Sequence, residues 1–300
     1  MIPLCLLTGF LGSGKTTLLK RLVDHLQGKR IAYVVNEFSS LDVDTKLLGS
    51  DNPSIISIPG GSIFCKCLVS EFIKQMNAIA TMQPPFEGLV IEASGMSDPR
   101  VIQKMLVETR LDRHFSISSI ISVADPSTLI KLIHTLPAVK AQIEASDTII
   151  LNKIDRAKTE AITKSEEIIR SINPTIRMIQ TTYANIELDI FNTTPIDRTL
   201  NGDLALCRDP HFFSAAIILD KPLNEAALRR TFTLFKDRIY RAKGFAIMAG
   251  KTVYVDWSLA GLSITSITPT LPVEYGLAVI FKGDDEKLEA ELTAALSNTN

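Results

Sequence analysis

The stretch Gly9-Phe10-Leu11-Gly12-Ser13-Gly14-Lys15-Thr16-Thr17 decides the fold of this 300-residue chain. It has the form G-x-x-x-x-G-K-[ST], follows the apolar run 2–7 and precedes leucines at helical spacing. A strand, a glycine-rich loop and a helix in that order are the setting in which this motif binds phosphate. Glycines let the backbone approach the phosphates, and N–H groups at the helix N-terminus face the negative charge. We therefore predict a nucleotide-phosphate site here.

Each residue of the motif has an expected role. Lys15 is expected to reach the β and γ phosphates, and Thr16 is expected to bind Mg²⁺ through its hydroxyl group. The other residues expected to contact the phosphates are Gly12, Ser13, Gly14 and Thr17.

Short apolar runs alternate with helical patterns over the first two thirds of the chain. The expected strands are 2–8, 30–36, 54–58, 88–92, 117–124, 148–151 and 175–180, and the expected helices are 16–27, 69–82, 100–108, 127–134, 137–145 and 160–172. Strands rich in Ile and Val on both faces, with helices between them, are typical of a buried, mostly parallel sheet. The predicted fold class is therefore α/β, with a nucleotide site at the carboxyl ends of the strands.

The pattern breaks in a polar, turn-rich stretch, which predicts a linker at 193–210. Five strands are expected after it, at 212–219, 239–248, 251–257, 262–267 and 277–282, with helices at 224–238 and 284–295. Strands clustered between two helices predict a smaller α+β domain. The predicted domains are thus a phosphate-loop domain at 1–192 and a C-terminal domain at 211–300.

Composition narrows the class of protein. The formal net charge of −1 gives no basic field for nucleic acid or an anionic membrane. No apolar run is long enough to span a bilayer, and the first apolar run leads straight into the phosphate loop, unlike a signal peptide. Cysteines stand at positions 5, 65, 67 and 207, and Cys65 and Cys67 are too close for an ordinary structural bridge. These features predict a cytoplasmic chain with reduced thiols.

A second motif, Asn152-Lys153-Ile154-Asp155, stands at the end of an expected strand. Asp155 could accept hydrogen bonds from the ring N–H and the exocyclic amine of guanine, and Asn152 could donate toward the acceptor edge of the ring. The stem of Lys153 could cover the face of the base. A carboxylate in this place rejects adenine, which would leave it unpaired. Four such residues could also form an ordinary cap after a strand, but their position downstream of a phosphate loop favours a guanine site.

A carboxylate ends another apolar strand, in Leu89-Val90-Ile91-Glu92-Ala93-Ser94-Gly95. In phosphate-loop NTPases an acid at this place holds Mg²⁺, and a glycine N–H three residues later can sense the γ-phosphate. We therefore expect Glu92 to act with Lys15 in catalysis and Gly95 to contact the nucleotide. An acidic strand end without such a role is the plainer alternative.

The segment Cys65-Lys66-Cys67 places two thiols two residues apart, where both could bind one soft or borderline metal ion. Two small buried residues in a loop remain an open alternative. Further ligands would have to come from elsewhere in the chain. The candidates are Glu37, Asp42, Asp44 and His114, of which Glu37 and His114 are preferred.

Taken together, these motifs resemble the CobW-type metallochaperone GTPases, within the group of nickel- and cobalt-insertion GTPases. The resemblance covers nearly the whole chain. It is carried by the phosphate loop, Asn36-Glu37-Phe38, Glu92-Ala93-Ser94-Gly95, Asp98-Pro99, Val123-Ala124-Asp125, Asn152-Lys153-Ile154-Asp155, Asn173-Pro174 and Ile239-Tyr240-Arg241-Ala242-Lys243-Gly244. It implies slow GTP hydrolysis coupled to delivery of Zn²⁺, Co²⁺ or Ni²⁺ into a client metalloprotein or cofactor enzyme.

The chain departs from the family pattern at two places. The family usually carries C-x-C-C, but here Leu68 stands where the third cysteine would be. In an offset alignment, Ser62 or Lys66 would instead be aligned with a family cysteine. Ser39-Ser40 replaces the usual Gly-Glu in the first switch. Fewer thiolates weaken the expected metal affinity.

Two other functions fit the motifs. One is a GTPase that activates a cofactor-dependent enzyme, such as a corrinoid enzyme, and carries no metal of its own. The other is a small-molecule kinase, which the guanine motif and the second domain disfavour. No arginine finger or water-positioning residue can be named, so intrinsic GTP hydrolysis is expected to be slow. A homodimer is left open.

Overall fold

The computed structural model describes residues 1–37, 54–59, 62–191, 199–205, 211–259, 261–269 and 272–297, without the side chains of Glu37 and Pro59. Within it, the phosphate-loop motif joins strand β1 (Ile2–Thr8) to helix α1 (Lys15–His25), as the sequence predicts. The contacts divide the chain into two units, the first of which ends at Ala205.

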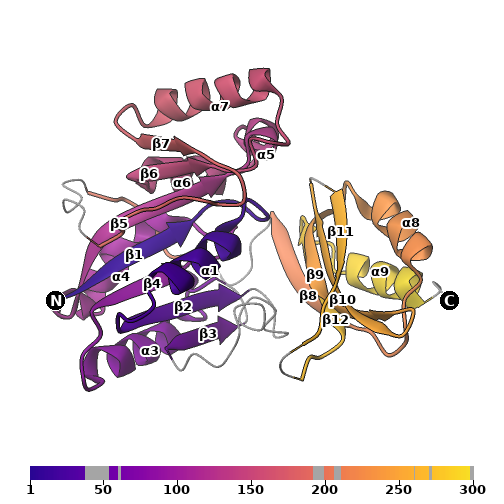
Figure 1. Ribbon diagram of the computed structural model, residues 1–300, viewed down its shortest axis with the longest axis horizontal. Helices are drawn as coiled ribbons and strands as arrows, with labels where there is room; N and C mark the ends of the chain where they lie inside the picture. The colour runs from indigo at the N-terminus through magenta and orange to yellow at the C-terminus, as the bar shows by residue number, and fades with distance from the viewer. Residues whose placement is uncertain are drawn as a thin grey trace. The chain divides into compact units, whose positions relative to one another are not determined.

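A seven-stranded sheet forms the centre of the first unit, in the order β3-β2-β4-β1-β5-β6-β7 (Figure 1). The strands after β1 are β2 (Ile31–Glu37), β3 (Ile55–Pro59), β4 (Gly88–Glu92), β5 (Phe115–Ala124), β6 (Thr148–Leu151) and β7 (Arg177–Gln180). Each described pairing is parallel. The predicted α/β class is confirmed.

Helices lie between successive strands wherever the connection is described, as a parallel sheet requires. They are α3 (Val69–Thr81), α4 (Ile102–Glu108), α5 (Pro126–Leu132), α6 (Pro137–Ala145) and α7 (Thr159–Ile172), with short 3₁₀ turns η1 (Pro99–Val101) and η2 (Leu111–Arg113). Strands β1 and β4 are almost wholly buried, which explains why they read as continuous apolar runs rather than alternating ones.

The strand order determines which residues can meet. Strand β1 lies between β4 and β5, with Leu7 opposite Glu92 and Thr8 opposite Ser122. Because parallel strands end at the same edge, the phosphate loop after β1 is flanked by the segments after β4 and β5. This edge is the one at which ligands bind in open α/β sheets.

The second unit contains an antiparallel sheet with the order β11-β10-β9-β12-β8. Its strands are β8 (Phe212–Ile218), β9 (Ile239–Met248), β10 (Lys251–Ser258), β11 (Gly261–Ser266) and β12 (Gly276–Lys282), and its helices are α8 (Glu225–Phe235) and α9 (Lys287–Ser297). Alternate residues of the sheet pack with these helices into one core, in which Phe232 stacks on Trp257 with ring centroids 5.7 Å apart. The expected α+β architecture is therefore present.

Part of the expected linker packs against the first unit. Leu200 is buried and donates its N–H to Oε1 of Gln103 at 2.8 Å. Ala205 forms a parallel bridge with Cys65. The boundary at 193–210 stays a prediction, but residues 199–205 are held on the surface of the phosphate-loop unit.

A search of the described residues for membrane spans found no helix with the length and apolar character to cross a bilayer.

Candidate functional site

The phosphate loop depends on three glycines with positive φ angles: Gly9 at 125°, Gly12 at 74° and Gly14 at 117°. Side-chain-bearing residues rarely adopt these conformations. A Cβ atom at Gly9 would also lie 2.1 Å from the carbonyl oxygen of Val123, and one at Gly14 would lie 2.3 Å from Nδ2 of Asn152. The glycines therefore let the loop curl tightly against β5 and the Asn152 motif.

Lys15 is buried at the start of α1, with only 7% of its surface exposed. Its Nζ donates to the carbonyl oxygens of Gly9 at 2.8 Å and Phe10 at 3.3 Å, so its charge lies inside the loop that the sequence assigns to phosphate. Ser13 is also buried, and among the described residues its Oγ has no hydrogen-bond partner. Leaving a buried hydroxyl unpaired costs free energy, which a phosphate oxygen in this loop would recover.

Thr16 and Glu92 meet as a magnesium site requires. The Thr16 hydroxyl donates to Oε1 of the buried Glu92 at 3.1 Å. A hydroxyl and a carboxylate oxygen beside a phosphate loop are the hard ligands that Mg²⁺ takes, usually with water and substrate phosphates completing the shell. The residues present therefore fit the ion.

Gly95 is brought against the phosphate loop. A Cβ atom at this position would lie 2.6 Å from the backbone N of Leu11. The segment after β4 thus touches the loop after β1.

Asn152 bonds to backbone groups on two sides. Its Nδ2 donates to the Ser13 carbonyl oxygen at 2.9 Å, and its Oδ1 accepts from the N–H of Ala184 at 2.9 Å. Asn152 is buried, and it fastens the phosphate loop to a segment after β7. An amide has a second N–H and a second acceptor lone pair, so the expected donation from Asn152 to guanine stays a prediction. Asp155, by contrast, is exposed, so its carboxylate is open to a ligand.

Segment 181–185 also lies at the site, although no sequence pattern indicated this. Tyr183 and Ala184 have positive φ angles of 52° and 51°, which are uncommon for residues with side chains. Arg21 of α1 holds this segment through the carbonyl oxygen of Tyr183 at 2.8 Å and Oδ1 of Asn185 at 3.1 Å. The segment lies beside the Asn152 motif, with bonds to Asn152 and Ile154. No sequence motif indicates the position of this segment, because its contacts are with residues far away in the sequence.

Lys153 is held in place by two partners. Its Nζ donates to the carbonyl oxygen of Gly12 at 2.5 Å and lies 3.5 Å from Oδ2 of Asp125. Asp125 also caps α5, because its Oδ1 accepts from the N–H groups of Ser127 and Thr128. Asp125 therefore fixes both the start of α5 and the direction of the Lys153 stem that is expected to cover a base.

We expect Asp125→Asn to weaken GTP binding about fivefold to tenfold while the protein stays folded. Asparagine caps helices about as well as aspartate, but it removes the negative partner of a partly exposed ammonium group, an interaction of about 1 kcal/mol. Competition titration against labelled nucleotide measures the affinity, and thermal unfolding measures the stability. Asp125→Ala is the matched variant, since it loses the cap as well and should also lower the unfolding temperature. An unchanged affinity in Asp125→Asn would mean that the pair does not orient Lys153 for binding.

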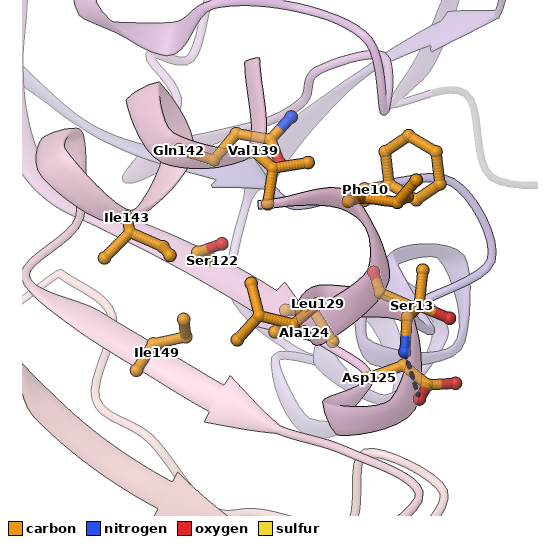
Figure 2. A pocket seen from close by; sticks show the side chains of 13 residues that line it. Phe10, Ser13, Ser122, Ala124, Asp125, Leu129, Val139, Gln142, Ile143 and Ile149 are labelled. Carbon is orange, nitrogen blue, oxygen red and sulfur yellow. Dashed lines mark hydrogen bonds between the residues drawn. The ribbon is translucent and has the colours of Figure 1, made fainter. Parts of the chain in front are cut away.

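A small pocket lies between the phosphate loop and the helices α5 and α6 (Figure 2). Phe10 and Ser13 line one end, and Ile143 and Ile149 line the other. Its volume is about 20 Å³, which is room for one water molecule. The pocket is therefore a packing gap beside the site and cannot hold a base or a sugar.

The thiol loop, residues 62–68, follows β3. Asn36 at the end of β2 and Ser97 after β4 both bond to it, so it lies at the same edge of the sheet as the phosphate loop. Cys65 is free and buried, but Cys67 is disulfide-bonded. The expectation that all thiols are reduced is therefore wrong for this structure, and Cys67 must be reduced before it can bind a metal. Burial raises the pKa of Cys5 to about 12, which makes that thiol a poor ligand.

The structure does not bring His114 to the thiol loop. His114 precedes β5, and its carbonyl oxygen accepts from the N–H of Ile2 at the start of β1. A ten-residue strand spans about 30 Å, so His114 lies at the opposite edge of the sheet from the phosphate loop. The side chain of Glu37 and all of Asp42 and Asp44 lie outside the described residues. In the part of the chain that is described, no cluster of three or more His, Cys, Asp or Glu side chains could hold a metal ion.

Comparison with known proteins agrees with this geometry. The model of the CobW/HypB/UreG nucleotide-binding domain matches residues 3–180. The zinc chaperone YjiA of Escherichia coli K12 is 32% identical over 197 residues, covering 64% of this chain and 61% of that protein. The zinc-regulated GTPase metalloprotein activator 1 of Dictyostelium discoideum is 25% identical, covering 88% of this chain and 67% of that protein. The chain thus matches less than two thirds of the length of YjiA.

A solved structure shares the fold. The Zn(II)-bound triple mutant of the YjiA GTPase aligns over 100% of this chain and 99% of its own, with a TM-score of 0.50 and 22% sequence identity.

The parallel sheet, the phosphate loop and the Thr16–Glu92 pair define a phosphate-loop NTPase. The chain belongs to the CobW/HypB/UreG family, because that family's model matches more than half of it. The family resemblance predicted from the sequence is confirmed.

Proposed function

We propose that this chain is a GTP-binding, slowly GTP-hydrolysing metallochaperone that delivers a divalent transition metal to a client protein. One observation carries the proposal: the phosphate loop, Glu92 and the thiol loop lie at one edge of one sheet. A nucleotide and a metal ion bound there would be close enough to affect each other. The printed names of the relatives, zinc chaperones and zinc-regulated GTPases, support the same function.

In the nucleotide site, each residue acts through the contact that it already makes. Lys15 places one positive charge inside the phosphate loop, where it would bind the β and γ phosphates. Thr16 and Glu92 would hold Mg²⁺, which when bound neutralises charge on the phosphates. Asp155 would select guanine, with Lys153 covering the base. Lys15 and Glu92 are the residues to which we assign catalysis.

For the transported metal we propose Zn²⁺, with Co²⁺ and Ni²⁺ as the other candidates. Cys65 and Cys67 would supply two thiolates, and Glu37 remains the candidate third ligand because β2 ends at this residue, on the edge that carries the thiol loop. His114 is not a candidate ligand, because it lies at the opposite edge of the sheet. A client metalloprotein or cofactor enzyme and a cytoplasmic location are further parts of the proposal, and a homodimer stays open.

The disulfide at Cys67 favours a second function. A GTPase that activates a cofactor-dependent enzyme needs no free thiol pair, and it would tolerate an oxidised Cys67. The two functions differ in one measurable property, which is whether the reduced protein binds zinc through these thiols.

We expect the reduced protein to bind one Zn²⁺ through Cys65 and Cys67, with an affinity that differs between GDP and a non-hydrolysable GTP analogue. Binding displaces thiol protons, so the affinity should rise with pH. Metal should change GTP affinity by the same factor as GTP changes metal affinity. The measurement is zinc titration of wild type and of Cys65→Ser/Cys67→Ser in both nucleotide states, with release of protons followed in parallel.

The double serine variant should lose at least about tenfold in zinc affinity, since serine is not a thiolate ligand. Cys5→Ser serves as the matched control, because Cys5 is buried in β1 away from the thiol loop. Equal zinc affinity in wild type and the double variant, in both nucleotide states, would leave the activator without a metal of its own as the better function.

A further inference from the structure

A buried asparagine joins three segments at the nucleotide edge of the sheet. Asn36, at the end of β2, is only 4% exposed. Its Oδ1 accepts from the N–H of Ile63 at 3.0 Å and from the N–H of Ser94 at 3.3 Å, while its Nδ2 donates to the carbonyl oxygen of Ile58 at 3.2 Å. One side chain therefore connects the end of β3, the thiol loop and the segment that follows Glu92.

Two serines form a second connection between the same segments. The hydroxyl groups of Ser62 and Ser97 lie 2.7 Å apart, and both residues are buried. Ser62 Oγ also accepts from the N–H of Phe64 at 3.1 Å, and the Ser62 carbonyl oxygen accepts from the N–H of Cys65 at 2.9 Å. Ser62 thus bonds to Cys65 through its backbone and to Ser97 through its side chain.

The far side of the segment after β4 is anchored to α6. Gln142 is 2% exposed, and its Nε2 donates to the carbonyl oxygens of Gly95 at 3.1 Å and Ser97 at 3.3 Å. Residues 94–97 therefore lie between α6 and the thiol loop, with polar contacts on both sides.

Buried polar groups are costly unless they are hydrogen-bonded, and a satisfied network specifies one arrangement of its members. This network includes the segment of Gly95, which touches the phosphate loop at Leu11. A shift of that segment on nucleotide binding would change the Ser62–Ser97 contact directly. The position of Cys65 would change with it, because Ser62 bonds to Cys65.

We propose that Ser97, Ser62 and Asn36 are positioning residues that transmit the nucleotide state of the phosphate loop to Cys65. This rests on the proposed function only in that GTP binds at the phosphate loop, and it needs no bound metal. The Ser97 hydroxyl is the part of the network that can be removed without touching either the phosphate loop or the thiol loop.

The test is the rate at which a thiol reagent alkylates Cys65 in the reduced, metal-free protein, read by mass spectrometry of the Cys65 peptide. The rate is compared between GDP and a non-hydrolysable GTP analogue. In wild type we expect the two rates to differ by about fivefold or more, the lower end of typical coupling between sites. In Ser97→Ala the two rates should agree within about twofold, although Ser97 does not bond to Cys65 and nucleotide affinity should be unchanged.

Three further variants complete the test. Ser62→Ala should abolish the nucleotide dependence as Ser97→Ala does, because it removes the same contact. It also removes the bond from the N–H of Phe64, so only the ratio of the two rates is compared. The double variant should show the same ratio as either single variant. Ser165→Ala is the matched control, since it deletes a fully buried serine hydroxyl on α7 that bonds to Pro126 and Ala161. It should keep the wild-type ratio of rates.

The inference is overturned if Ser97→Ala or Ser62→Ala keeps the wild-type ratio, or if wild type shows no nucleotide dependence while it binds GTP. Nucleotide affinity is measured in the same samples. Absence of GTP binding would instead overturn the proposed function, so the two failures are told apart.

Discussion

Lys15→Ala should lower GTP affinity by about 100-fold or more. The Lys15 ammonium group is buried in the phosphate loop between the carbonyl oxygens of Gly9 and Phe10. Charge-assisted hydrogen bonds are worth about 1.5–3 kcal/mol each, and a lysine at this position is expected to make them to two phosphates. Each 1.4 kcal/mol corresponds to a factor of ten in affinity, so loss of this one side chain should dominate binding.

The measurement is titration with a fluorescent GTP derivative, together with circular dichroism and thermal unfolding to establish that the variant is folded. Lys20→Ala is the matched control, because Lys20 is an exposed lysine on the same helix. It should bind GTP like wild type. A folded Lys15→Ala that binds GTP with wild-type affinity would contradict the phosphate-loop assignment.

The parts of the site that sequence predicted are those encoded by local pattern. The phosphate loop needs glycines where the backbone takes positive φ angles, and these show directly as Gly9, Gly12 and Gly14. Glu92 follows an apolar run, so it is placed at a strand end by periodicity alone. Once the sheet is taken as parallel, both features must share one edge, which is where the structure has them.

The parts that were missed are encoded by contacts between distant segments. No residue pattern near positions 181–185 indicates that this segment will form hydrogen bonds with Arg21 and Asn152. The bonds of Asn152 to Ser13 and Ala184 likewise join segments that are far apart in the sequence. The disulfide at Cys67 could not be predicted, because its pairing depends on the fold and not on cysteine spacing.

One error could have been avoided from sequence. The expected strand at 117–124 already placed His114 ahead of a parallel strand that leads toward the nucleotide edge. A residue before such a strand belongs to the opposite edge of the sheet, as the bond from Ile2 to His114 now shows. His114 cannot be a metal ligand beside the nucleotide, because it precedes its strand. Cys65 follows its strand, β3, so the same argument places this thiol at the nucleotide edge.

Asp155→Asn should change the base preference of the protein from guanine to xanthine. The Asp155 carboxylate is exposed after β6, and its nearest charged partner among the described residues is Arg156, with 3.9 Å between Nε and Oδ2. Such an exposed pair is weak, so the carboxylate is available to accept from the ring N–H and the exocyclic amine of guanine. An asparagine side chain has one acceptor and one donor group in place of two acceptors. It would leave one guanine donor facing another donor, and we expect GTP affinity to fall about 100-fold or more.

The same change should improve binding of xanthosine triphosphate, whose ring carries a carbonyl oxygen where guanine carries the amine. The new amide N–H₂ could donate to that oxygen, which a carboxylate would repel. Competition titrations of GTP, xanthosine triphosphate and ATP against wild type and Asp155→Asn measure this change in base preference. Glu160→Gln is the matched control, because it removes an exposed carboxylate on the nearby helix α7. A wild type that binds ATP as well as GTP would refute the guanine site. A variant that loses GTP without gaining xanthosine triphosphate would mean that Asp155 supports the loop and does not face the base.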